Sequence, residues 1–192
     1  MKKISIRVEV QSPIVLAASS NTGVMTDVRD YISGSVLRGV FASRMISAQG
    51  LGQKAHENAD FLYLFNGAIR FVDAYVTEED KVSTPLPLSL QKRKLADTKD
   101  HKEYVDMYSV AENMLPGYKG MSGFAYINEE EGTLQPAMVR KQVTLHMSRH
   151  SDKERRLGSS VDGGIYNYEA IIPGQVFTGE LIGQAADLER LL

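Results

Sequence analysis

The chain has 192 residues, of which 43% are hydrophobic and 24% are charged, and its formal net charge is −2. This length is enough for a domain with its own core, and the composition excludes wholesale disorder, a collagen repeat and a long coiled coil. The charge excludes a uniformly basic nucleic-acid-binding protein but leaves room for a local basic surface.

Cysteine is absent from the sequence, which excludes disulfide frameworks, thiolate zinc sites and cysteine nucleophiles. The N-terminal segment alternates charged and apolar residues, so it lacks the continuous apolar core of a signal peptide. No window contains the roughly 18 apolar residues that a membrane helix requires. We therefore expect a soluble, cytoplasmic protein with no membrane partner.

The first part of the sequence predicts a strand followed by a helix. Residues 4–10 alternate between apolar and polar with the period of a half-buried strand. Apolar residues at helical spacing then predict a helix over about 35–47. Ser33 or Ser35 is expected to cap its start, because a hydroxyl can accept a hydrogen bond from a free backbone N–H there.

The rest of the sequence predicts mainly strands, with an irregular polar stretch at 84–102. The other expected elements are a short helix at 61–65, strands at 68–76, 124–127, 139–147, 166–172 and 176–182, and the start of a helix at 185–192.

This order predicts an α+β fold with a mainly antiparallel sheet. Specifically, we expect one ferredoxin-like (RRM-type) domain over 1–192, with insertions at about 80–123 and 146–164. The βαββαβ pattern needs one more strand after its second helix. The sequence stops where that strand would begin, so we expect a chain truncated at its C-terminus.

Sequence motifs of common catalytic sites, such as a phosphate-binding loop, HExxH or GxSxG, are absent. His146 and His150 have the spacing of two metal ligands on a helix, but the alternation of 139–147 predicts a strand, so we expect no metal site there. Asp27 and Asp30 precede the predicted helix, and paired carboxylates can hold Mg²⁺. Helix capping by Asp30 and simple solvation of Asp27 are the alternatives.

Basic residues are concentrated in two segments. Residues 138–156 contain six basic and two acidic side chains, and residues 91–102 contain five basic and two acidic ones. Such concentrations suit the phosphates of a nucleic acid, although a solvated loop has the same composition. Tyr166 and Tyr168 lie at strand spacing on one face, where they either stack on exposed bases or pack on the core.

Four sequence elements resemble, in the same order, those of the RAMP superfamily of CRISPR-associated proteins. They are 31–39 (YISGSVLRG), 65–74 with its RFVDA sequence, 146–170 with its GGIYNYEA sequence, and 173–180 (PGQVFTGE). The sequence is most similar to the large RAMP subunit of type III-D effector complexes. In that family the first element opens the first helix of a ferredoxin-like domain.

The resemblance implies an RNA-binding subunit of a type III CRISPR-Cas interference complex, which holds guide (CRISPR) RNA together with the other subunits. It implies that the first-helix element approaches the RNA backbone and that 146–164 protrude between two strands. A helix start also favours phosphate through its amides and dipole. The expected RNA contacts are Ser35, Arg38, Gly39, Lys141, His146, Arg149, His150, Lys153, Arg155, Arg156 and Tyr166.

Two other functions are left open by the sequence. Some backbone subunits of the superfamily cut target RNA with an aspartate before the first helix. Asp27 is the corresponding candidate here, in a metal-dependent endoribonuclease with Mg²⁺ as its cofactor. The third candidate is a structural subunit whose basic loops contact acidic proteins and no RNA. The sequence favours a non-catalytic protein and assigns no catalytic residue, cofactor or metal.

Overall fold

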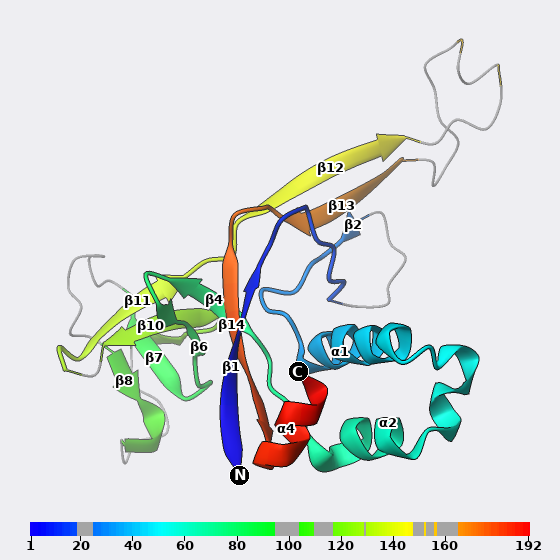
Figure 1. Cartoon of the computed structure of the whole chain (residues 1–192). Coiled ribbons are helices and arrows are strands. Elements are labelled where there is room, and N and C mark those ends of the chain that lie inside the picture. Colours follow the sequence, from blue (N-terminus) through cyan, green and yellow to red (C-terminus); the bar gives the residue numbers. More distant parts are fainter. Residues whose placement is uncertain are drawn as a thin grey trace. The chain divides into compact units, whose positions relative to one another are not determined.

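The computed structural model describes residues 1–18, 25–94, 104–109, 117–128, 130–147, 152, 156 and 165–192. Its helices and mostly antiparallel strands confirm the α+β class (Figure 1). The chain divides into two compact units. Unit 1 consists of Met1–Tyr75 and Val139–Leu192, and unit 2 of Val76–Met138. Among the described residues, no helix is both long and apolar enough to cross a bilayer.

The central sheet of unit 1 is built on two long strands. β1 (Lys2–Glu9) and β14 (Val176–Gly183) pair antiparallel along their whole length, and β3 (Arg70–Phe71) pairs with β14. Alternate residues of β14 are buried, and Phe177 and Leu181 are fully enclosed. The period-2 pattern that predicted these strands therefore marks one core-facing side of the sheet.

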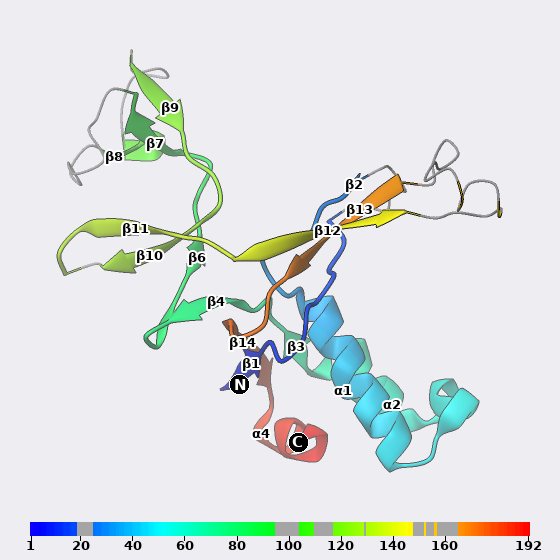
Figure 2. The ribbon, with the colours of Figure 1, turned by 90° about the horizontal axis from the view of Figure 1, so that it is seen from above.

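Helices cover that side of the sheet (Figures 1 and 2). They are α1 (Gly34–Ala48), α2 (Ala59–Tyr63), the π-helical turn η2 (Leu64–Ala68) and α4 (Ala185–Leu191). The 3₁₀ helix η1 (Gly52–Glu57) connects α1 to α2. Apolar residues of the covering helices join Leu181 in one buried cluster, which contains Leu64, Phe65, Ile69, Leu188 and Leu191. Burial of this cluster, rather than helix propensity, stabilises helices as short as α2 and α4.

A second sheet of unit 1 consists of a hairpin and a short third strand. β12 (Lys141–Met147) and β13 (Ile165–Ile171) are antiparallel, and β2 (Met25–Thr26) runs parallel to β13. The buried amide of Gln175 accepts a hydrogen bond from the Arg140 N–H (2.6 Å) and donates one to the Arg140 carbonyl (2.8 Å). This side chain therefore ties the start of β14 to the start of the hairpin.

Unit 2 consists of short strands around a small core of Leu86, Ala125 and Leu134. Its elements begin with β4 (Tyr75–Glu78), whose first residue belongs to unit 1. They continue with β5 (Lys81–Val82), β6 (Thr84–Pro85), β7 (Leu90–Arg93), β8 (Tyr104–Asp106), η3 (Met107–Ser109), β9 (Tyr118–Gly120), β10 (Phe124–Asn128) and β11 (Thr133–Ala137). β10 pairs with both β11 and β6, and β7 pairs with both β8 and β9.

Two sequence predictions about these elements are wrong. The strand expected at 68–76 is broken between β3 and β4, because Ala74 leaves it to exchange backbone hydrogen bonds with Ile32 (2.8 and 3.0 Å). The stretch expected to be irregular contains β6 and β7. β7 carries no apolar alternation: Leu90 packs against the core of unit 2, but Lys92 and Arg93 are exposed, and pairing on both edges completes the strand.

The start of α1 lies directly against the backbone that follows β3. A Cβ atom on Gly34 would lie 2.1 Å from the Phe71 carbonyl oxygen, so only glycine fits there. The Gly34 N–H donates to the Asp73 carboxylate at 2.7 Å. Ser33 occupies the N-cap position without capping through its side chain, so the predicted serine cap is wrong and Asp73 serves instead.

We predict opposite effects of alanine at the two glycines of α1. Gly34→Ala forces helix and strand apart and lowers the free energy of unfolding by about 1–3 kcal/mol or more. Gly39→Ala meets nothing within 4 Å and raises it by about 0.5–1 kcal/mol, because glycine is a poor helix former. Urea unfolding of both variants checks this. Wild-type stability in Gly34→Ala would contradict the packing described.

Candidate nucleic-acid interface

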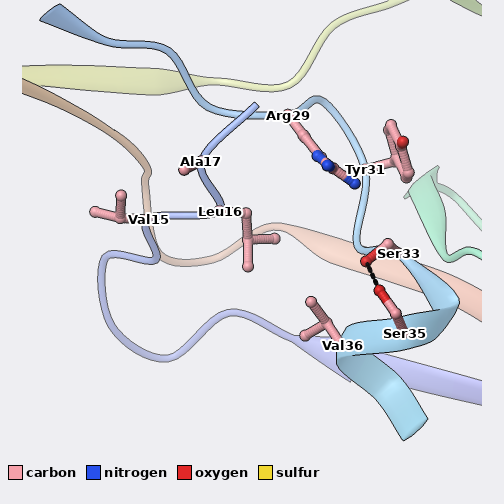
Figure 3. Close-up of a pocket in the computed structure, with 8 residues that line it drawn as sticks. All are labelled: Val15, Leu16, Ala17, Arg29, Tyr31, Ser33, Ser35 and Val36. Carbon is pink, nitrogen blue, oxygen red and sulfur yellow. Dashed lines mark hydrogen bonds between the residues drawn. The ribbon is translucent and has the colours of Figure 1, made fainter. Parts of the chain in front are cut away.

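A pocket of about 280 Å³ lies beside the start of α1 in unit 1 (Figure 3). Its lining residues are Val15, Leu16, Ala17, Arg29, Tyr31, Ser33, Ser35 and Val36. The pocket therefore has an apolar wall and a polar wall that contains one cation, one tyrosine and two serine hydroxyl groups. None of the lining residues is acidic.

Two chain segments that pair with each other build the pocket, one around residues 15–18 and the second around residues 27–32. The Arg29 N–H donates to the Leu16 carbonyl at 2.9 Å, and the Ala18 N–H donates to the Asp27 carbonyl at 2.8 Å. A backbone bridge between Ile32 and Ala74 fixes the point where the second segment enters α1. The pocket is thus held by backbone pairing on both sides, so its lining side chains project from a defined framework.

The polar wall of the pocket combines a guanidinium, an aromatic ring and paired hydroxyls. The Arg29 guanidinium carbon lies 5.8 Å from the centre of the Tyr31 ring, within range of a cation–π interaction. The Ser33 and Ser35 hydroxyl oxygens are 2.8 Å apart. Because one hydrogen bond joins these two hydroxyls, a proton is left to donate to a ligand. These groups suit an anion next to a planar or apolar group.

The pocket continues onto an exposed face of α1 that carries three of the predicted RNA contacts. Ser35, Arg38 and Gly39 are all exposed. Glycine in a helix interior makes the helix less stable than alanine does, by about 1 kcal/mol. At position 39 no packing contact requires a glycine, because a Cβ there would meet nothing within 4 Å. Gly39 therefore leaves helix backbone accessible beside the Arg38 cation.

The hairpin of β12 and β13 carries aromatic side chains on one face. His146 and Tyr168 meet edge to face with their ring centres 5.4 Å apart, and Tyr168 is 42% exposed. In the strand register His146 is opposite Tyr166, so all three positions share this face. The opposite face of β12 exposes the apolar residues Val143, Leu145 and Met147.

Lys141, predicted as an RNA contact, is held inside unit 1. Its ammonium lies 2.7 Å from the Asp30 carboxylate and 3.1 Å from that of Glu169, and it donates to the Val28 carbonyl at 2.6 Å. Glu169 also accepts the Val28 N–H at 2.8 Å. This junction fastens the segment that leads to the pocket onto the hairpin, and it neutralises the charge of Lys141.

The junction shifts the pKa values of both Lys141 and Glu169. Burial alone would lower the pKa of Lys141, but hydrogen bonds and charge interactions with Asp30 and Glu169 outweigh it, and the pKa is raised. Burial alone would raise the pKa of Glu169, but the Val28 N–H and Lys141 outweigh it, and the pKa is lowered. Each group is therefore held in its charged form by the others.

The remaining predicted site residues are distributed as follows. Asp27 is exposed, and Asp30, its expected partner in a magnesium site, pairs with Lys141 instead. Arg156 is exposed, and Tyr166 belongs to β13. The positions outside the described residues are Arg149, His150, Lys153 and Arg155. Within the described ranges, no three histidine, aspartate or glutamate side chains gather closely enough to hold a metal ion.

Sequence reasoning missed Arg29 and Tyr31, which supply the cation and the ring of the pocket. Both lie in a short segment without periodicity between β2 and α1. Their only signal was the element that resembles the RAMP first-helix motif, which begins at Tyr31 and which Arg29 shortly precedes.

The sequence matches no protein-family model, and no curated protein is significantly similar to it. The function is therefore argued from the residues of this chain.

We predict that the Lys141 junction stabilises the fold only between acid and strongly alkaline pH. The lowered pKa of Glu169 gives a contribution that is present above its ordinary value of 4.5 and lost as the pH falls through the lowered value. The raised pKa of Lys141 gives a contribution that is present below 10.5 and lost as the pH rises through the raised value.

Lys141→Met should therefore lower the free energy of unfolding on the order of 1 kcal/mol at neutral pH, and by less near about pH 3, because the contribution of Glu169 declines as the pH falls below 4.5. Lys54→Met, at an exposed position, is the control and should change little at either pH. Urea unfolding at both pH values measures this. If Lys141→Met lowered the free energy of unfolding equally at both pH values, the contacts described for Lys141 with Asp30 and Glu169 would be contradicted.

Proposed function

We propose that this protein is an RNA-binding subunit of a CRISPR-associated ribonucleoprotein complex of the RAMP type, and that it holds guide RNA on unit 1. The observation that carries the proposal is the pocket at the start of α1, which has a cation and two serine hydroxyls in its lining but no carboxylate. Such a site attracts a phosphate, and its apolar wall offers a surface to a sugar or base.

Side chains, more than helix amides, supply the proposed phosphate contacts. The Gly34 N–H is already used by Asp73, which reduces what the helix start itself can offer an anion. Arg29 in the pocket and Arg38 on the exposed face of α1 provide the positive charge. Gly39 allows a sugar–phosphate backbone to approach the helix closely, which explains an exposed glycine in a helix interior.

Base stacking is assigned to the aromatic face of the hairpin. Tyr168 is in register with Thr26 on β2, and Arg29 follows three residues later along the same segment. At 3.3 Å per residue this separates the two surfaces by roughly 10 Å, a distance that one short stretch of single strand can bridge. Tyr168 and His146 would stack on bases while Arg29 and Arg38 hold phosphates.

Contacts between the resembling sequence elements support the family part of the proposal. Gly34 of the first element lies against Phe71 and Asp73 of the second. Gly179 of the fourth would place a Cβ 3.0 Å from Ala74 Cβ. Segments that resemble the family in order are thus in contact here, which supports a ferredoxin-like arrangement as part of the proposal. Partner subunits and a cytoplasmic location belong to the same proposal.

Fluorescence anisotropy with a labelled single-stranded RNA, over a salt series and with EDTA present, tests this function. Arg29→Gln and Arg38→Gln should each weaken binding several-fold and reduce the slope of log K against log salt by about 0.7. Arg44→Gln is the matched control, because Arg44 is exposed on another side of α1. Absence of RNA binding at about 50 mM salt, or equal binding by all three variants, would contradict the proposal.

Gly39→Ala separates RNA contact from fold stability. The added methyl group stabilises α1 but stands between the helix and an approaching RNA backbone. We therefore expect this variant to unfold at a higher urea concentration and yet to bind RNA more weakly than the wild type. Unchanged affinity would remove α1 from the interface.

A further inference from the structure

The three-stranded sheet of unit 2 gathers lysines from two segments of the chain. β7 is its central strand, and Lys92 on β7 is directly opposite Lys119 on β9 and Tyr104 on β8. Lys94 continues the line of β7, and its N–H donates to the Gly117 carbonyl at 2.7 Å. Since alternate strand residues share a face, Lys92, Lys94 and Lys119 lie on one side of the sheet.

This arrangement of lysines is unfavourable in the isolated protein. Residues directly opposite each other in an antiparallel pair have Cβ atoms about 5 Å apart, and like charges there are destabilising. Lys92, Lys94 and Lys119 are exposed, and none of them forms an ion pair with a described residue. Asp106, the acidic residue of these strands, accepts the Tyr108 N–H at 3.0 Å. By register Asp106 is opposite Leu90 on the same face, but it forms no ion pair with these lysines. The fold thus places two like charges opposite each other without a salt bridge in the described part of the chain.

We propose that Lys92, Lys94 and Lys119 form a second RNA-binding surface, which contacts the phosphodiester backbone through unit 2. That the ligand is RNA rests on the function proposed above. At strand spacing Lys92 and Lys94, which directly follows β7, are about 6.6 Å apart, and Lys119 adds a cation on the neighbouring strand. Ammonium groups on long, flexible side chains suit binding to the phosphates of an RNA backbone, which does not depend on the base sequence.

The composition of the sheet favours RNA over an acidic protein as the ligand. The exposed residues of β7, β8 and β9 are all polar or glycine, and the tyrosines of these strands are half-buried. A protein interface normally has an apolar or aromatic centre, whereas a surface that follows phosphates needs only cations.

The test uses the full chain with both lysines of the opposed pair replaced. Lys92→Gln/Lys119→Gln should weaken binding of the same single-stranded RNA several-fold and lower the salt slope by about 1.4, at about 0.7 per contact. Its midpoint of thermal unfolding should rise, because the repulsion is removed. Lys54→Gln/Lys81→Gln removes the same charge from two other exposed positions and should leave both quantities close to those of the wild type.

The outcomes distinguish this inference from the proposed function. If Lys92→Gln/Lys119→Gln binds RNA like its control while Arg29→Gln binds more weakly, the unit 2 surface is overturned and the proposed function stands. If the wild type binds no RNA, both fail. If the lysine pair is needed to bind polyglutamate but not RNA, the ligand is an acidic protein and the RNA assignment is overturned.

Discussion

The contact between Gly34 and the backbone of Phe71 is the constraint on which the rest of unit 1 depends. A Cβ at that position would lie 2.1 Å from the Phe71 carbonyl oxygen, so the first turn of α1 lies too close to β3 for any residue other than glycine. Asp73 completes the contact by accepting the Gly34 N–H. With the helix start fixed in this way, Ser35 lines the pocket and Arg38 follows on the exposed face next to it.

A second set of contacts fastens the hairpin to the same framework. Lys141 holds Asp30 and Glu169 together, and Gln175 pairs with the backbone of Arg140. Asp30 is exposed, but Lys141 and Glu169 are half-buried and Gln175 is buried, so losing a partner would leave a polar group in these positions unsatisfied. These contacts place the aromatic face that carries Tyr168 at a defined distance along the chain from Arg29. The proposed stacking surface and the proposed phosphate site are therefore linked through β2 and the contacts of Lys141.

Periodicity predicted the elements that bury one face. β1, β14 and α1 each carry such a pattern, and their bounds agree with the sequence prediction to within a few residues. It failed where pairing between distant residues decides the structure. β7 has no apolar face, and its partners lie more than ten residues away, so 84–102 were expected to be irregular. The same limit applies to the site, because Lys141 looks like a surface cation in sequence, and only the fold brings Asp30 and Glu169 to it.

Mapping where RNA touches the protein tests the central claim most directly. The full chain would be photo-crosslinked to thiouridine-labelled single-stranded RNA, and the modified peptides identified by mass spectrometry. If unit 1 holds RNA as proposed, cross-links are expected at the pocket and exposed face of α1, around Tyr31, and on the aromatic face of the hairpin, around Tyr168. Cross-links confined to the other face of the central sheet, where Lys3 pairs with Glu180, would contradict the proposal.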